Sequence, residues 1–163
     1  MEKKDHLPLY GPGPLYVGII GALTAAGLLA DRFTVISEGR LHFFRVPLIV
    51  LGALFIAAGI YMWIQAVIVS RLDDRITEGK LVTDGIYRWV RNPIYSAFMT
   101  AFSGMLLITG NVFLFILPIL YWIIMTVILR NTEEIWLREK FGKEYELYCR
   151  RVNRCWPWFP GRG

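Results

Sequence analysis

Residues 46–69 have the sequence VPLIVLGALFIAAGIYMWIQAVIV, and this stretch decides the fold class. Gln65 is its only strongly polar side chain, and a helix of about 20 residues is long enough to cross the hydrocarbon core of a bilayer. The stretch therefore predicts a membrane-spanning helix. The whole chain agrees, because 55% of its 163 residues are hydrophobic, whereas soluble domains are roughly 45–50% apolar.

Other apolar runs predict three more spans. One covers residues 15–30 and follows a Pro/Gly-rich segment, residues 10–14, that stops a helix from extending toward the N-terminus. A signal peptide is the alternative for this run, but the hydrophobic segments that follow favour a retained span. The other two spans lie within residues 94–129, which are apolar except near Thr109-Gly110-Asn111. Gly-Asn is turn chemistry, so this region predicts a helical hairpin.

Four spans place both termini and the loop of residues 71–91 on one side of the membrane. Most basic residues share that side, including all of those from Arg130 onward, whereas the opposite side carries only Arg32, Arg40 and Arg45. Because cytoplasmic loops carry an excess of Lys and Arg, both termini and the long polar segments are predicted to be cytoplasmic.

Residues 133–152 interleave aromatic and charged side chains and predict an amphipathic helix at the interface or over the ends of the spans. The aromatic residues within 156–160 are typical of an interfacial anchor. The expected fold is therefore all-α: a single domain over residues 1–163, a transmembrane helical bundle of about four spans with an amphipathic C-terminal cytoplasmic helix. The oligomeric state, and a short extra helix within residues 31–45, are left open.

The composition argues against two other kinds of partner. The net charge of +5 does not indicate nucleic acid, because the basic residues lie at the ends of apolar runs and form no nucleic-acid-binding motif. No metal site is expected, since His6 and His42 are the only histidines and neither has a second ligand at metal spacing. Cys149 and Cys155 are too few for a disulfide framework and are expected to be reduced thiols.

A cluster of polar residues follows the last span: Arg130, Asn131, Glu133 and Glu134. Glu134 lies four residues from Arg130 on a helix, so the ordinary interpretation is an interfacial ion pair. The density of polar groups at a membrane edge also favours a functional site. The spacing alone leaves both interpretations open.

Asn92 and Pro93 predict the start of a helix, because asparagine is a good N-cap and proline suits the first turn. Such a helix start also leaves free amide donors and a positive dipole end. These favour a carboxylate, such as the one on a methionine moiety.

An ordered series of motifs runs from residue 79 to residue 157. It comprises Leu81-Val82-Thr83-x-Gly85-x-Tyr87, Arg91-x-Pro93-x-Tyr95, the helical hairpin, Arg130-x-x-Glu133-Glu134, and Phe141-Gly142-x-x-Tyr145-x-x-Tyr148. The series resembles the isoprenylcysteine carboxyl methyltransferase family, and phospholipid N-methyltransferases are similar across the same region. The first two spans match only in being hydrophobic.

The resemblance implies a membrane methyltransferase that uses S-adenosylmethionine and acts on a lipid or prenylated substrate. It places the cofactor at the cytoplasmic ends of the last two spans, under the C-terminal helix. The residues implied to hold the cofactor are Gly79, Lys80, Leu81, Val82, Tyr87, Asn92, Pro93, Ile94, Tyr95 and Glu134. Arg130 is implied to face the substrate with Asn131 beside it, and these two with Glu133 and Glu134 are the expected catalytic residues.

The sequence departs from the family pattern at Asn92, where the family usually has histidine, and at Ser96-Ala97, where a small glycine commonly follows the tyrosine. Arg130 suits an anionic acceptor and Asn92 cannot titrate, which favours O-methylation of an isoprenylcysteine α-carboxyl group. The alternative is phospholipid N-methylation, in which Glu133 or Glu134 takes a proton. A non-enzymatic membrane protein and a reductase of the steroid-reductase type are further alternatives.

Overall fold

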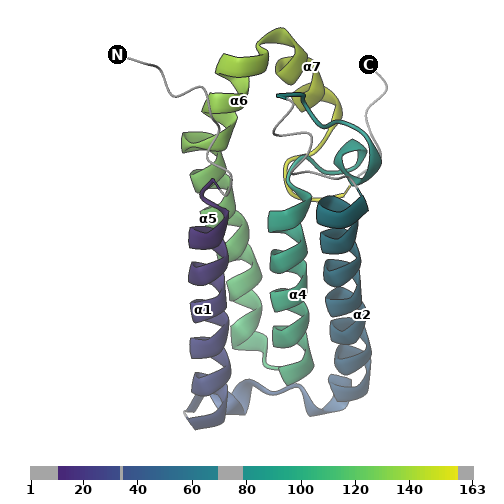
Figure 1. The fold of residues 1–163 in the computed structure, drawn as a ribbon. Coiled ribbons are helices and arrows are strands. Elements are labelled where there is room, and N and C mark those ends of the chain that lie inside the picture. The colour runs from purple at the N-terminus through teal and green to yellow at the C-terminus, as the bar shows by residue number, and fades with distance from the viewer. Residues whose placement is uncertain (1–10, 34, 70–78, 158–163) are drawn as a thin grey trace.

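The computed structural model describes residues 11–33, 35–69 and 79–157, and every named element in these ranges is a helix. Four antiparallel helices form the bundle, and two short ones are stacked over one end of it (Figure 1). The bundle helices are α1 (Gly13–Phe33), α2 (Arg45–Ile64), α4 (Pro93–Thr109) and α5 (Leu117–Asn131), and the stacked helices are α6 (Glu133–Phe141) and α7 (Lys143–Arg151).

The length and composition of the helices make this a membrane protein. Three helical segments are long and apolar enough to cross a bilayer: Gly13–Phe33, His42–Ile68 and Val112–Phe141. The fourth bundle helix, α4, is a shorter apolar helix of 17 residues. The all-helical membrane fold expected from the sequence is confirmed. Which end of the bundle faces the cytoplasm stays a prediction.

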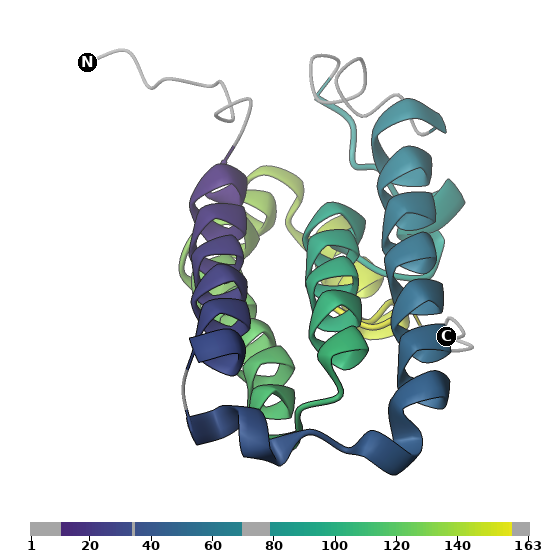
Figure 2. The ribbon, with the colours of Figure 1, turned by 90° about the horizontal axis from the view of Figure 1, so that it is seen from below.

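The two ends of the bundle are built differently. At one end, the 3-10 helices η1 (Val35–Gly39) and η2 (His42–Phe44) connect α1 to α2 (Figure 2), so residues 31–45 contain two short helical turns. The predicted turn of the hairpin lies at this end, where Gly110 ends α4 with a φ of +69° that glycine adopts readily. A short 3-10 helix, η5 (Val112–Ile116), then leads into α5.

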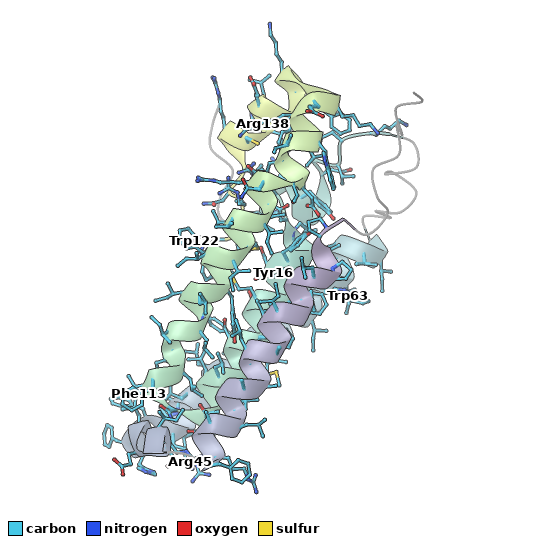
Figure 3. All side chains as sticks on the ribbon, turned by 90° about the vertical axis from the view of Figure 1, so that its left-hand side faces the viewer. Tyr16, Arg45, Trp63, Phe113, Trp122 and Arg138 are labelled. Carbon is cyan, nitrogen blue, oxygen red and sulfur yellow. The ribbon has the colours of Figure 1, made fainter. Side chains whose placement is uncertain are left out.

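The opposite end holds the start of α4 and the end of α2, which finishes in a π-helical turn, η3 (Gln65–Val69). The 3-10 helix η4 (Gly85–Arg88) lies there as well, together with α6 and α7 (Figure 1). Figure 3 labels Arg138 at this end, and Arg45 and Phe113 at the other. Segments that are far apart in the sequence therefore meet at the α6–α7 end.

Helices α2 and α4 approach each other closely because small residues face one another. A Cβ added to Gly104 would lie 2.5 Å from the carbonyl oxygen of Gly52, and one added to Gly59 would lie 2.6 Å from that of Ala97. Small residues that let helix backbones touch are typical of membrane bundles. The small side chain of Ala97 is therefore matched by a glycine on the neighbouring helix.

Larger side chains fill the space between α1, α4 and α5. Tyr16, Tyr121 and Met125 are fully buried there. The Thr24 and Tyr121 hydroxyls are 2.8 Å apart, and the Tyr16 hydroxyl donates to the Tyr121 carbonyl at 3.4 Å. Trp122, by contrast, is 41% exposed and points away from the bundle (Figure 3). The core thus lies on the α4 side of α5.

The prediction of one continuous helix over residues 133–152 is wrong, because the chain breaks at Gly142. This glycine has a φ of +51°, in the left-handed region that residues with a Cβ rarely adopt. The break separates α6 from α7, and α7 buries Tyr145 and Tyr148. Trp156 is 49% exposed. The rest of the predicted aromatic anchor, residues 158–160, lies outside the described residues.

Candidate functional site

A cavity of about 570 Å³ lies at the α6–α7 end of the bundle. Its walls come from residues 11–17, the end of α2, residues 79–95, α6 and α7. The volume is within the range of roughly 300–1,000 Å³ that is usual for small-molecule sites in proteins. The cavity therefore has the size of a ligand site and is assembled from segments across the whole described chain.

The residues predicted to hold a cofactor meet in this cavity, with one exception. Its lining includes Gly79, Lys80, Leu81, Val82, Tyr87, Asn92, Pro93, Ile94 and Tyr95. Of the residues predicted to be catalytic, Glu133 also lines it, whereas Arg130, Asn131 and Glu134 are not among its lining residues. The structure thus separates Glu133 from its three predicted companions, and the roles of all four stay predictions.

The start of α4 is shaped partly as the sequence predicts. Pro93 occupies the first turn and Asn92 the N-cap position, but the Asn92 side chain does not cap the helix. Its Nδ2 instead donates to the Arg154 carbonyl at 3.1 Å. The Arg91 amide likewise donates to the Asn153 carbonyl at 2.9 Å. Asn92 therefore helps to fix the C-terminal segment against the cavity wall.

Helix α7 forms part of the cavity wall and contacts η4 there. The Tyr148 hydroxyl donates to the Tyr87 carbonyl at 2.6 Å, and both residues line the cavity. Burial raises the pKa of the Tyr145 and Tyr148 hydroxyls. Both therefore remain protonated at neutral pH and can act as hydrogen-bond donors.

Glu133 supplies a carboxylate to the cavity wall. Its Oε1 accepts a hydrogen bond from the hydroxyl of Tyr95, and both residues line the cavity. A Cβ added to Gly11, whose φ is +43°, would lie 2.7 Å from the same oxygen. Glycine at position 11, two residues before α1, therefore suits both the positive φ and the close approach of the chain to this carboxylate.

Glu134 is buried, and its partners differ from the one the spacing predicts. Arg154 donates to its two oxygens at 2.5 and 3.0 Å, Arg91 lies at 3.5 Å and Arg138 at 4.0 Å. The hydrogen bond to Glu134 raises the pKa of Arg154 above its usual value. Of the arginines in the described ranges, these three form its ion pairs.

The ordinary interpretation of the spacing, an ion pair between Arg130 and Glu134, is therefore wrong. A helical relation between them requires a continuous helix, but Thr132 has a φ of −133° and a ψ of −90° and interrupts it. Arg130 is exposed, and the Asn131 side chain donates to the carbonyl of Val127 at 2.8 Å. These two residues lie beside the cavity-bearing end without lining the cavity.

Some lining residues were missed from the sequence. Trp63 of α2, Val67 of η3 and Phe98 of α4 belong to apolar runs and carry no distinguishing signal. Arg91 is different, because it belongs to the Arg91-x-Pro93-x-Tyr95 motif but was given no role. Its side chain is only 9% exposed, and it lines the cavity.

These features define a class: an all-helical membrane protein with a cavity at one end of its bundle. A family model described as phospholipid methyltransferase matches residues 42–144, which is more than half of the chain. The chain therefore belongs to the phospholipid methyltransferase family, a family of membrane methyltransferases that act on lipids. Comparison with curated proteins and with solved structures gave no match.

Proposed function

We propose that this protein transfers a methyl group from S-adenosylmethionine to the amine of a phospholipid head group. The observation that carries the proposal is the Glu133 carboxylate in the cavity wall, hydrogen-bonded by Tyr95. A protonated amine must lose a proton before its nitrogen can attack, so this reaction needs a general base. A carboxylate acceptor, in contrast, is already ionised at neutral pH.

The residues of the cavity fit the proposed cofactor. Tyr87, Tyr145 and Tyr148 offer aromatic surface for a purine ring, and Glu133 offers a carboxylate for a cationic group. Arg91 also lines the cavity and its Nε has no hydrogen-bond partner in the structure, so its guanidinium is only partly used by the protein and can face an anionic group. The cavity thus combines apolar surface with both signs of charge, as the purine and amino-acid parts of this cofactor require.

The chemistry follows from these groups. When bound, the cofactor would supply a methyl group on a sulfonium, and its carbon–sulfur bond would break as the acceptor nitrogen bonds to the methyl carbon, with S-adenosylhomocysteine as the leaving group. Glu133 takes the proton from the nitrogen, and Tyr95 orients the carboxylate by its hydrogen bond. The enclosing side chains exclude water and align the acceptor, which is catalysis by proximity.

The structure changes the balance between the two acceptors considered from the sequence. The preference for an isoprenylcysteine carboxylate depended on Arg130 as an anion-binding residue and on Asn92, which cannot titrate. Arg130 is exposed and is not part of the cavity lining, which removes the first of these reasons. The amine reaction depends on a carboxylate base, and Glu133 is in the cavity. We therefore favour the phospholipid amine.

The proposal is tested by supplying both acceptors with labelled cofactor. Phosphatidylethanolamine in nanodiscs is expected to gain the methyl group, and an isoprenylcysteine analogue is not. The substitution Glu133→Gln keeps the shape of the side chain and removes the base, so kcat is expected to fall by about 10²- to 10⁴-fold. The kcat of each variant is measured with phosphatidylethanolamine.

Two exposed residues provide controls. Glu139→Gln removes an exposed carboxylate from the same helix as Glu133, and Arg130→Gln removes the exposed arginine; both are expected to keep the wild-type rate. Methylation of the isoprenylcysteine analogue alone, with a large loss in Arg130→Gln, would contradict the amine reaction and restore the carboxylate one.

A further inference from the structure

We infer that Arg91 is the anion-binding residue of the cavity. It holds either the carboxylate of the cofactor's amino-acid part or the phosphate of the lipid head group. The inference rests on the proposed function and names a contact within that site. The two anions share the same chemistry, since a guanidinium forms paired, charge-assisted hydrogen bonds with either group.

The first observation is that Arg91 has a donor left over. Its Nη1 donates to the Cys149 Sγ at 2.6 Å and to the Tyr145 hydroxyl at 3.5 Å. Its Nε is buried and has no hydrogen-bond partner. Buried donors are nearly always paired, and this one belongs to a side chain in the cavity wall that is only 9% exposed. The protein neighbours of Arg91 therefore leave part of its hydrogen-bonding capacity unused, and the part of the side chain that lines the cavity can offer this capacity to an anion.

The second observation is the charge balance around Glu134. One carboxylate faces three arginines, and Arg154 takes both of its oxygens at 2.5 and 3.0 Å. Arg91 reaches only Oε1, at 3.5 Å. Arg138 is 61% exposed, so water can screen its charge. The positive charge of Arg91 is therefore buried and only partly compensated, which is costly unless another anion approaches it.

The third observation is the opposite charge elsewhere on the cavity wall. Glu133 and Arg91 line the same cavity, and so do Lys80 and Lys140. The two lysines are exposed to solvent, which screens their charge, so Arg91 is the largely buried cation of the wall and Glu133 its carboxylate. This pattern complements a zwitterion. The phosphoethanolamine head group is such a zwitterion, and it would place its phosphate at Arg91 and its amine at Glu133. The carboxylate of the cofactor's amino-acid part would use Arg91 alone, which leaves Glu133 to the acceptor amine.

Calorimetry with two nucleosides tests the cofactor arm. S-adenosylhomocysteine carries the amino-acid part, whereas 5′-methylthioadenosine lacks it. Arg91→Gln is expected to weaken binding of S-adenosylhomocysteine by about 10- to 100-fold and to leave methylthioadenosine binding unchanged. Arg91→Lys keeps the charge without the planar fork, so its loss is expected to be smaller. If thermal unfolding shows that Arg91→Gln does not fold, the affinities of the Arg91→Lys variant for the two nucleosides are compared instead.

The KM for phosphatidylethanolamine tests the lipid arm. If Arg91 holds the phosphate, Arg91→Gln raises this KM with little change in kcat and leaves nucleoside binding intact. Arg138→Gln is the matched control, because Arg138 also faces Glu134 but does not line the cavity; it should change neither quantity.

Equal loss of both nucleosides, or no change in nucleoside affinity and lipid KM, would overturn the inference and leave Arg91 a structural residue. A failure of the proposed function can be told apart from a failure of this inference, because nucleoside binding is measured without turnover. A protein that methylates only the isoprenylcysteine analogue would still show whether Arg91 distinguishes the two nucleosides.

Discussion

Asp31 and Glu134 are both buried carboxylates paired with arginine, but they lie at opposite ends of the bundle and in different surroundings. Asp31 accepts hydrogen bonds from Arg40 Nε at 3.2 Å and Nη2 at 2.6 Å, and from Asn111 Nδ2 at 2.7 Å. Glu134 is shared by three arginines, two of which are largely buried.

The first cluster is balanced and closed. One carboxylate faces one arginine, and the fully buried Asn111 also donates to the Ile36 carbonyl and accepts from the Phe113 amide. The cluster fixes η1 against the Gly110 turn, and the bond from the Leu41 amide to the Gly110 carbonyl fixes the residues that follow η1 to the same turn. The Glu134 cluster carries excess positive charge and borders a cavity. A buried carboxylate paired with arginine therefore stabilises one end of the bundle, whereas at the other end the same kind of pair leaves positive charge that can bind an anion.

The largest effect is expected from breaking the unbalanced cluster. Glu134→Ala leaves Arg91 and Arg154 buried without their carboxylate, so the free energy of unfolding should fall by about 3–5 kcal/mol. Denaturant titration in detergent measures this change. Glu139→Ala, on the exposed face of the same helix, is the control and should have little effect. Equal stability of the two variants would show that the arginines do not depend on Glu134.

A smaller effect is expected at the balanced end. Asp31→Ala leaves Arg40, whose side chain is 41% exposed and can be hydrated, so the free energy of unfolding should fall by about 1–3 kcal/mol. Because this end is remote from the cavity, the affinity for S-adenosylhomocysteine should stay at the wild-type value in the folded protein. A matching loss of affinity would mean that the two ends are coupled.

The smallest effect concerns the two thiols near Glu134 and is measured as the rate of their labelling in the folded protein. Cys155 is 2% exposed, and burial raises its pKa to about 11, so at neutral pH it is protonated and shielded. Cys149 is partly exposed. A maleimide should therefore label Cys149 first. Glu134→Asp, by loosening the contact to Arg154, should speed labelling of Cys155.

The same labelling tests the predicted sidedness of the membrane. A membrane-impermeant maleimide added to intact cells should leave Cys149 unmodified if the cavity end is cytoplasmic, and should label it after the membrane is opened. Labelling of Cys149 in intact cells would place this end outside.

The sequence by itself determined the membrane-spanning helices, the position of the hairpin turn and most of the residues of one cavity wall. Long apolar runs predict spans because hydropathy adds along a helix, and Gly110-Asn111 predicts the hairpin because few residues adopt a positive φ. The motifs in residues 79–95 predicted most of one wall of the cavity. Such features depend only on neighbours along the chain.

Only the tertiary structure decided which charged groups meet. The spacing in the sequence suggests Arg130 as the partner of Glu134, whereas in the structure the partner is Arg154. A spacing of four residues brings two side chains together only along an unbroken helix, and Thr132 interrupts this helix. The break at Gly142 separates α7 from α6, so the partners of Arg91 and Glu134 come from distant positions in the chain. Electrostatic partners are chosen by distance through space, which hydropathy and short-range spacing do not specify.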